Sequence, residues 1–139
     1  LSDLCYYIPS QIGGATAASF LHKFFFGSKH SFGMTINKLA AYQGFMLETL
    51  ISMFLMLTII TVATNEKIST SIIGFSVGGI IAVCSFVAGP FTGASMNPAR
   101  SIGPTILANN FDSLIIYILA PIIGAVLAIF IYNYIKENS

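Results

Sequence analysis

The segment that decides the fold is Gly93-Ala94-Ser95-Met96-Asn97-Pro98-Ala99-Arg100, which lies between two long apolar stretches. Asn97 and Pro98 are typical of a helix start, with Asn as the N-cap and Pro in the first turn. The helix that they open reaches only to about residue 108, before the pair Asn109-Asn110. About eleven residues rise roughly 16 Å, which is half of the ~30 Å hydrocarbon core of a bilayer. The sequence therefore predicts a half-helix at 97–108 that enters a membrane without crossing it.

The composition indicates a membrane protein rather than a soluble domain. Hydrophobic residues make up 55% of the 139 positions, and Asp, Glu, Lys and Arg only 8%, whereas soluble domains carry roughly 25% of these charged residues. So few charges could not cover a water-facing surface. The alternative is a subunit that is buried in a soluble complex. A net charge of +1 and the lack of a basic cluster speak against nucleic acid as a partner.

Four stretches are apolar and long enough to cross a bilayer, which needs about 20 such residues. They run over residues 4–26, 39–64, 68–88 and 114–135. The third is expected to end where Gly89-Pro90 breaks the helix. The sequence thus predicts one all-α membrane domain over 1–139, with four spanning helices and one re-entrant half-helix. We expect an integral, multi-pass protein of the cell membrane, with the lipid bilayer as its surroundings.

Small residues recur at helical spacing on two of the predicted spans. Such stripes let membrane helices approach one another closely. The third span carries Gly74, Gly78, Ala82, Ser85 and Gly89, and the last span carries Ala120, Gly124 and Ala128.

Two charged residues, Glu48 and Arg100, lie well inside apolar segments, where a charge is costly and therefore indicates function. Glu48 is expected to accept hydrogen bonds from N–H groups that an irregular loop leaves unpaired; a proton relay is the alternative. Arg100 belongs to the first turn of the half-helix, where its charge adds to the positive end of the helix dipole. That arrangement would repel cations. The alternative is an arginine that snorkels to the membrane interface.

Asn97 and the residues before it are expected to face a lumen. The side-chain amide of Asn97 can donate hydrogen bonds near the middle of the membrane, so a bound water turns its own hydrogens away and a continuous proton wire is interrupted. The carbonyl groups of Gly93, Ala94 and Ser95 would offer acceptors along the route. An ordinary N-cap is the alternative interpretation of Asn97.

No enzyme site, cofactor or metal site is predicted. Residues 74–78 match the GxSxG nucleophile pattern, but both histidines, His22 and His30, come earlier in the chain and the segment reads as a membrane helix. Cys5 and Cys84 lie in apolar surroundings without metal spacing. We therefore expect both to be buried, unreactive thiols.

Residues 93–101, Gly-Ala-Ser-Met-Asn-Pro-Ala-Arg-Ser, resemble the second Asn-Pro-Ala signature of the major intrinsic protein family, the aquaporins and aquaglyceroporins. The resemblance extends along nearly the whole chain in family order. Residues 7–11 resemble the third span, 43–49 the start of the fourth with its buried glutamate, 62–64 its end, and 117–124 the sixth. The residue pattern is closest to the nodulin-26-like group of that family.

The resemblance implies two inverted three-helix repeats that build a right-handed six-helix bundle. This chain would supply the third to sixth spans and the second half-helix, with the first two spans and the first half-helix missing. The chain starts with Leu1 rather than Met, and residues 1–3 are not the cationic start of a signal peptide, so we expect that it begins inside a longer protein. The resemblance also implies a homotetramer with one pore per subunit, and a loop at 27–38 that lies outside the cell.

In this family, the narrowest ring involves the Arg of the second signature, the residue three before its Asn, and one residue of the fifth span. These positions are Arg100, Ala94 and Ser85. Strict water channels usually have His at the position of Ser85, so the resemblance implies a wider and more polar constriction. Glycerol channels have Asp after the signature Arg, where this chain has Ser101.

The resemblance therefore implies a passive channel for water and small neutral solutes, such as glycerol or metalloid acids, that excludes protons and ions. One alternative is a non-conducting structural or truncated membrane protein. Another is a secondary active transporter, which usually needs several titratable groups near the midplane, whereas Glu48 stands alone.

Overall fold

A computed structural model describes residues 2–27 and 32–138, and within these ranges the chain is all-α, as predicted. The helices are α1 (Leu4–Phe26), α2 (Ala41–Ala63), α3 (Thr70–Thr92), α4 (Pro98–Ala108) and α5 (Leu114–Glu137). His30 and part of the 27–38 loop fall outside the described residues. The short α4 has 11 residues, and Pro98 is its first residue, as the half-helix prediction requires.

Three of the described helices, α2, α3 and α5, are long and apolar enough to cross a membrane. Large apolar side chains cover their outer faces: Phe75 and Phe86 on α3 are 85% and 87% exposed. Such surfaces suit lipid or another helix rather than water. The protein is therefore an integral, multi-pass membrane protein. Helix α1 has 23 residues, about the length of a span, but it is less apolar, so its membrane crossing stays a prediction.

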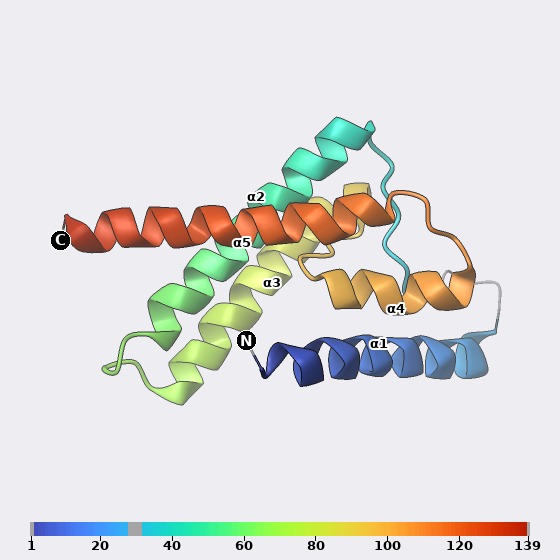
Figure 1. The fold of residues 1–139 in the computed structure, drawn as a ribbon, viewed down its shortest axis with the longest axis horizontal. Coiled ribbons are helices and arrows are strands. Elements are labelled where there is room, and N and C mark those ends of the chain that lie inside the picture. Colours follow the sequence, from blue (N-terminus) through green and yellow to red (C-terminus); the bar gives the residue numbers. More distant parts are fainter. Residues whose placement is uncertain (1, 28–31, 139) are drawn as a thin grey trace.

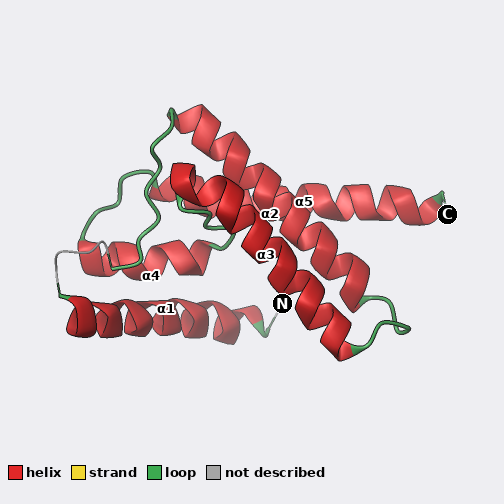
Figure 2. Cartoon of the chain, turned by 180° about the vertical axis from the view of Figure 1, so that it is seen from behind, coloured by secondary structure: helices red, strands yellow, loops and turns green. Residues whose placement is uncertain are grey.

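The described helices pack as a group of three, α2, α3 and α5, and a pair, α1 and α4, which contact each other where α4 meets α5. Helix α5 crosses α2 in the most extensive contact, and α3 runs back beside α2 (Figures 1 and 2). Helix α1 lies along α4, and the segment that precedes α2 descends to α4 (Figure 1). Figure 1 thus shows the short α4 between the long α1 and α5, where a half-helix would be enclosed by protein.

Glycines allow the closest of these helix contacts. A Cβ added to Gly124 of α5 would lie 2.9 Å from both Met53 N and Ser52 Cβ of α2. One added to Gly103 of α4 would lie 2.6 Å from the Ala15 carbonyl carbon of α1. The α5 stripe of small residues is thus buried in a helix contact, as predicted. The α3 stripe is different, because a Cβ at Gly74 or Gly78 would meet no atom within 4 Å in the described part of the chain.

Helix α3 continues through Gly89-Pro90, so the predicted break at residue 88 is wrong. The helix ends at Gly93, whose φ of 83° is the left-handed conformation that glycine adopts at helix ends. Pro90 removes a single backbone donor in the last turn, and such a loss is tolerated in membrane helices when neighbouring groups satisfy the freed carbonyl. The extra turn carries Thr92 into the protein interior, where it is 0% exposed.

One cluster of buried apolar residues lies where α2, α3 and the start of the 93–97 segment meet. It consists of Ile51, Cys84, Ala88 and Ala94. Cys84 is buried as predicted, but Cys5 is exposed, so that prediction is wrong. Among the described helices α1 contacts only α4, and its first turn, which contains Cys5, is exposed throughout.

Candidate pore site

The segment from residue 93 to 97 connects α3 to α4 through an unusual backbone. Ala94 and Met96 have φ values of 45° and 53°, and non-glycine residues in this left-handed region cost about 1–3 kcal/mol each. Such a conformation persists only where surrounding groups hold it. The Ala94 N–H donates to the Thr92 hydroxyl at 3.2 Å, which is the first of these restraints.

The carboxylate of Glu48, on α2, holds the 93–97 segment with further hydrogen bonds. Glu48 is 0% exposed. It accepts hydrogen bonds from the Thr92 hydroxyl at 2.6 Å, from Ser95 N at 2.9 and 3.1 Å, and from Met96 N at 3.1 Å. Consecutive N–H groups that converge on one anionic side chain form a concave nest. The segment therefore turns its N–H groups toward Glu48, and Glu48 itself lines neither of the cavities described below.

Tyr117 of α5 supports the same region from another side. Its side chain is 1% exposed, and its hydroxyl donates to the carbonyl oxygen of Thr92 at 2.7 Å. Thr92 thus accepts from α5 through its carbonyl group and donates to α2 through its hydroxyl. Helices α2, α3 and α5 are joined at this one residue, immediately before the left-handed Gly93.

Asn97 caps α4 and also faces open space. Its Oδ1 accepts a hydrogen bond from Ala99 N at 2.9 Å, so the ordinary N-cap interpretation holds. Oδ1 is occupied by the cap, which leaves the Nδ2 hydrogens as the polar atoms that this side chain can offer to a cavity. Asn97 lines two cavities, so capping α4 and facing a cavity are compatible roles.

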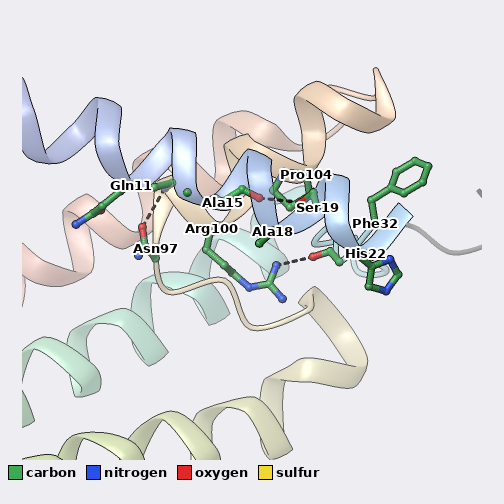
Figure 3. A pocket seen from close by; sticks show the side chains of 12 residues that line it. Gln11, Ala15, Ala18, Ser19, His22, Phe32, Asn97, Arg100 and Pro104 are labelled. Atoms are coloured by element: carbon green, nitrogen blue, oxygen red, sulfur yellow. Dashed lines mark hydrogen bonds between the residues drawn. The ribbon is translucent and has the colours of Figure 1, made fainter. Parts of the chain in front are cut away.

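Two cavities flank the start of α4. The first, of about 500 Å³, lies between α1 and α4 and is shown in Figure 3. The second, of about 710 Å³, is bounded by α2, α3, α5 and the 93–97 segment. Every residue predicted for the filter, namely Ser85, Gly93, Ala94, Ser95, Asn97 and Arg100, lines the second cavity. Asn97, Arg100 and Gln11 line both cavities, so they lie at the boundary between them.

Arg100 is held by the segment that precedes α2. Its Nη1 donates to the carbonyl oxygen of Gly33 at 3.0 Å, as the dashed line in Figure 3 shows. The side chain remains exposed to the cavities. The guanidinium group therefore adds a fixed positive charge to the N-terminal end of α4, where the helix dipole is also positive.

A match to a known protein family shows to which family this chain is related. A family model described as "Major intrinsic protein" matches residues 1–132. The chain belongs to the major intrinsic protein family. The prediction made from the 93–101 signature is confirmed.

Curated relatives of this major intrinsic protein come from the predicted subgroup. "Aquaporin NIP1-1" of Zea mays is 36% identical over 131 residues, which cover 94% of this chain and 46% of that protein. "Aquaporin NIP6-1" of Arabidopsis thaliana is 37% identical, with 94% and 43% covered. "Nodulin-26" of Glycine max is 33% identical, with 94% and 48% covered. The chain therefore spans about half the length of these relatives.

Sequence reasoning missed several polar residues of this major intrinsic protein. Thr92 and Tyr117 support the segment, and Gln11 lines both cavities. Gln11 carried a usable signal, because an uncharged polar side chain in an apolar span is itself unusual. Thr92 and Tyr117 carried none, since either residue is common in membrane helices and their roles depend on contacts with distant segments.

Proposed function

We propose that this major intrinsic protein forms a passive channel for water and small neutral solutes and excludes protons and ions. The observation that carries the proposal is the position of Ser85, Ala94, Asn97 and Arg100 on one cavity. Relatives that share about a third of its residues are named aquaporins, which supports the same function.

The mechanism that we propose follows from the polar groups at the cavity. The Nδ2 group of Asn97 donates to the oxygen of a passing water, which then points both hydrogens away from the residue and cannot relay a proton through it. The carbonyl groups of Gly93, Ala94 and Ser95 accept hydrogen bonds along the route, because their segment directs its N–H groups to Glu48 and Thr92. Arg100 and the positive end of α4 repel cations.

The small side chains at the cavity favour solutes larger than water. Ser85 is exposed on α3, and Ala94 presents only a methyl group. We propose glycerol and metalloid acids as permeants in addition to water, since their hydroxyl groups match a constriction that offers a hydroxyl and carbonyl oxygens. We also propose a homotetramer, in which apolar faces such as that of Phe86 contact lipid or a neighbouring copy.

Stopped-flow measurements on lipid vesicles test this function. Vesicles that contain the intact protein in which this chain occurs are expected to change volume several times faster than empty vesicles in water and glycerol gradients. A pH-sensitive dye inside the same vesicles should report no added proton flux. The proposed function is wrong if folded protein leaves both volume changes at the rate of empty vesicles, and the non-conducting structural alternative then holds.

A further inference from the structure

The segment from Phe32 to Ala40, which we call the 32–40 segment, is anchored to the pore region at three places. Its Gly33 carbonyl accepts from Arg100. Its Thr35 hydroxyl lies 2.7 Å from the Ser101 hydroxyl. Its Lys38 N–H donates to the Phe91 carbonyl at 2.8 Å. One segment thus contacts the end of α3 and the start of α4.

The Thr35 anchor is the most buried of the three. Thr35 is 3% and Ser101 0% exposed, and neither residue lines either cavity. Thr35 also lies against the backbone of Gly93, where an added Cβ would be 3.1 Å from the Thr35 Cα. These contacts place a side chain of the 32–40 segment behind the cavity wall.

The hydrogen positions along this contact follow from counting donors. Each hydroxyl has one hydrogen to donate, and the Ser95 hydroxyl donates its hydrogen to the Asn97 carbonyl at 2.9 Å. With that hydrogen used, Ser101, whose hydroxyl is 2.6 Å from that of Ser95, can donate to Ser95, and Thr35 can in turn donate to Ser101. In this arrangement the hydroxyl chain runs from Thr35 through Ser101 and Ser95 to the carbonyl of Asn97.

We propose that this buried hydroxyl chain positions the Arg100 guanidinium and thereby sets the solute selectivity of the channel, although Thr35 and Ser101 never touch the permeant. The proposal rests on the proposed function. It makes Thr35 and Ser101 positioning residues, because their effect reaches the cavity through the Gly33 carbonyl that holds Arg100 and through the backbone of Asn97.

The physical reason lies in the spacing of the contacts. Thr35 is two residues from Gly33 in the 32–40 segment, and Ser101 follows Arg100 directly in α4. The Thr35–Ser101 bond thus holds together the two backbones that carry the Gly33 carbonyl and the Arg100 side chain. Without the bond, the 32–40 segment can shift relative to α4, and the guanidinium leaves its fixed place at the cavity.

Two replacements at Thr35 distinguish the effect of its hydroxyl group from the effect of its shape. Thr35→Val keeps the shape and removes the donor, whereas Thr35→Ser keeps the donor and removes the methyl group. Ser101→Ala removes the middle of the chain. Thr58→Val serves as the matched control, because the Thr58 hydroxyl donates to the Phe54 carbonyl of its own helix at 2.9 Å.

The measurement is the ratio of glycerol to water permeability in vesicles that contain the intact protein. A merely structural role changes the number of folded channels, which scales both permeabilities equally and leaves the ratio unchanged. We expect Thr35→Val and Ser101→Ala to shift the ratio by about fivefold, the factor that corresponds to losing one typical hydrogen bond. Thr35→Ser and Thr58→Val should leave the ratio within about twofold of the parent protein.

The outcomes separate this inference from the proposed function. If the parent conducts but Thr35→Val and Ser101→Ala keep its ratio, the hydroxyl chain does not set selectivity and the inference is wrong. The inference also fails if Thr35→Ser shifts the ratio as much as Thr35→Val, because shape rather than the donor then matters. A parent that passes neither water nor glycerol overturns the proposed function, and the inference with it.

Discussion

At the scale of single residues, Glu48 shows how a costly side chain is retained. A carboxyl group without partners is expensive to bury, but Glu48 accepts from one hydroxyl and two backbone N–H groups. The 93–97 segment depends on the Glu48 carboxylate in turn. The left-handed backbone at Ala94 and Met96 leaves the N–H groups of this segment without regular backbone hydrogen bonds. The carboxylate and the strained segment therefore stabilise one another.

Replacing Glu48 tests this mutual support. Glu48→Gln keeps the size but turns one acceptor oxygen into an amino group, which cannot accept from an N–H group. We expect the free energy of unfolding to fall by about 3 kcal/mol, because hydrogen bonds to charged groups contribute about 1.5–3 kcal/mol each. Denaturation in detergent micelles, followed by circular dichroism, measures the change.

The matched control for Glu48 is Glu66→Gln, which changes an exposed glutamate after the end of α2. Surface substitutions of this kind stay within about 0.5 kcal/mol. Equal denaturation midpoints for the two variants would contradict a supporting role of Glu48.

At the scale of helices, the two stripes of small residues have different surroundings. Gly124 of α5 is enclosed by α2, whereas Gly78 of α3 has open space within 4 Å. Sequence periodicity predicts both stripes equally well, since it reports only which residues share a face. Which face meets another helix depends on how the helices cross, and α2 crosses α5 most extensively.

A pair of glycine replacements measures this difference. Gly124→Ala should destabilise the protein by about 1–3 kcal/mol, because the new methyl group overpacks the α2–α5 contact. Gly78→Ala should leave stability unchanged or raise it by up to about 1 kcal/mol, the difference in helix propensity. Thermal unfolding in micelles gives both values. If the Gly124→Ala and Gly78→Ala variants are equally stable, α2 and α5 do not approach each other as closely as the structure shows.

At the scale of the whole molecule, the order of spans determines which loops share a side of the membrane. Helix α2 separates Lys38 from Glu66, and α3 returns the chain to the side of Lys38. Because α4 has only 11 residues and is too short to cross a bilayer, we expect α5 to end with Glu137 on the side of Glu66. We expect the side of Lys38 to lie outside the cell, as the family resemblance implies.

Single cysteines report this arrangement directly. In a background with Cys5→Ala and Cys84→Ala, we expect Lys38→Cys to react with a membrane-impermeant maleimide in intact cells. Glu66→Cys and Glu137→Cys should react only after permeabilisation. Labelling of Glu66→Cys and Glu137→Cys from opposite faces would show that α4 crosses the membrane or that α3 or α5 does not.

Features that depend on contacts between neighbouring residues agree with the expectations from sequence, whereas some features that depend on distant contacts do not. Asn97 and Pro98 predict the start of α4 correctly, because capping involves residues only two positions apart. Pro90 misleads, because a local rule for breaking helices does not see the partners that sustain the last turn of α3. Cys5 misleads similarly, since an apolar neighbourhood in sequence says nothing about which helices pack there.

Apolar length and short local signals are enough to predict the membrane class, the half-helix, the family and the existence of the spans α2, α3 and α5. Which groups meet around the cavity depends on tertiary packing. Glu48 reaches Ser95 across 47 positions, Thr35 reaches Ser101 across 66, and Arg100 reaches Gly33 across 67. Hydrogen bonds act over about 3 Å, so such pairs exist only once the helices have packed.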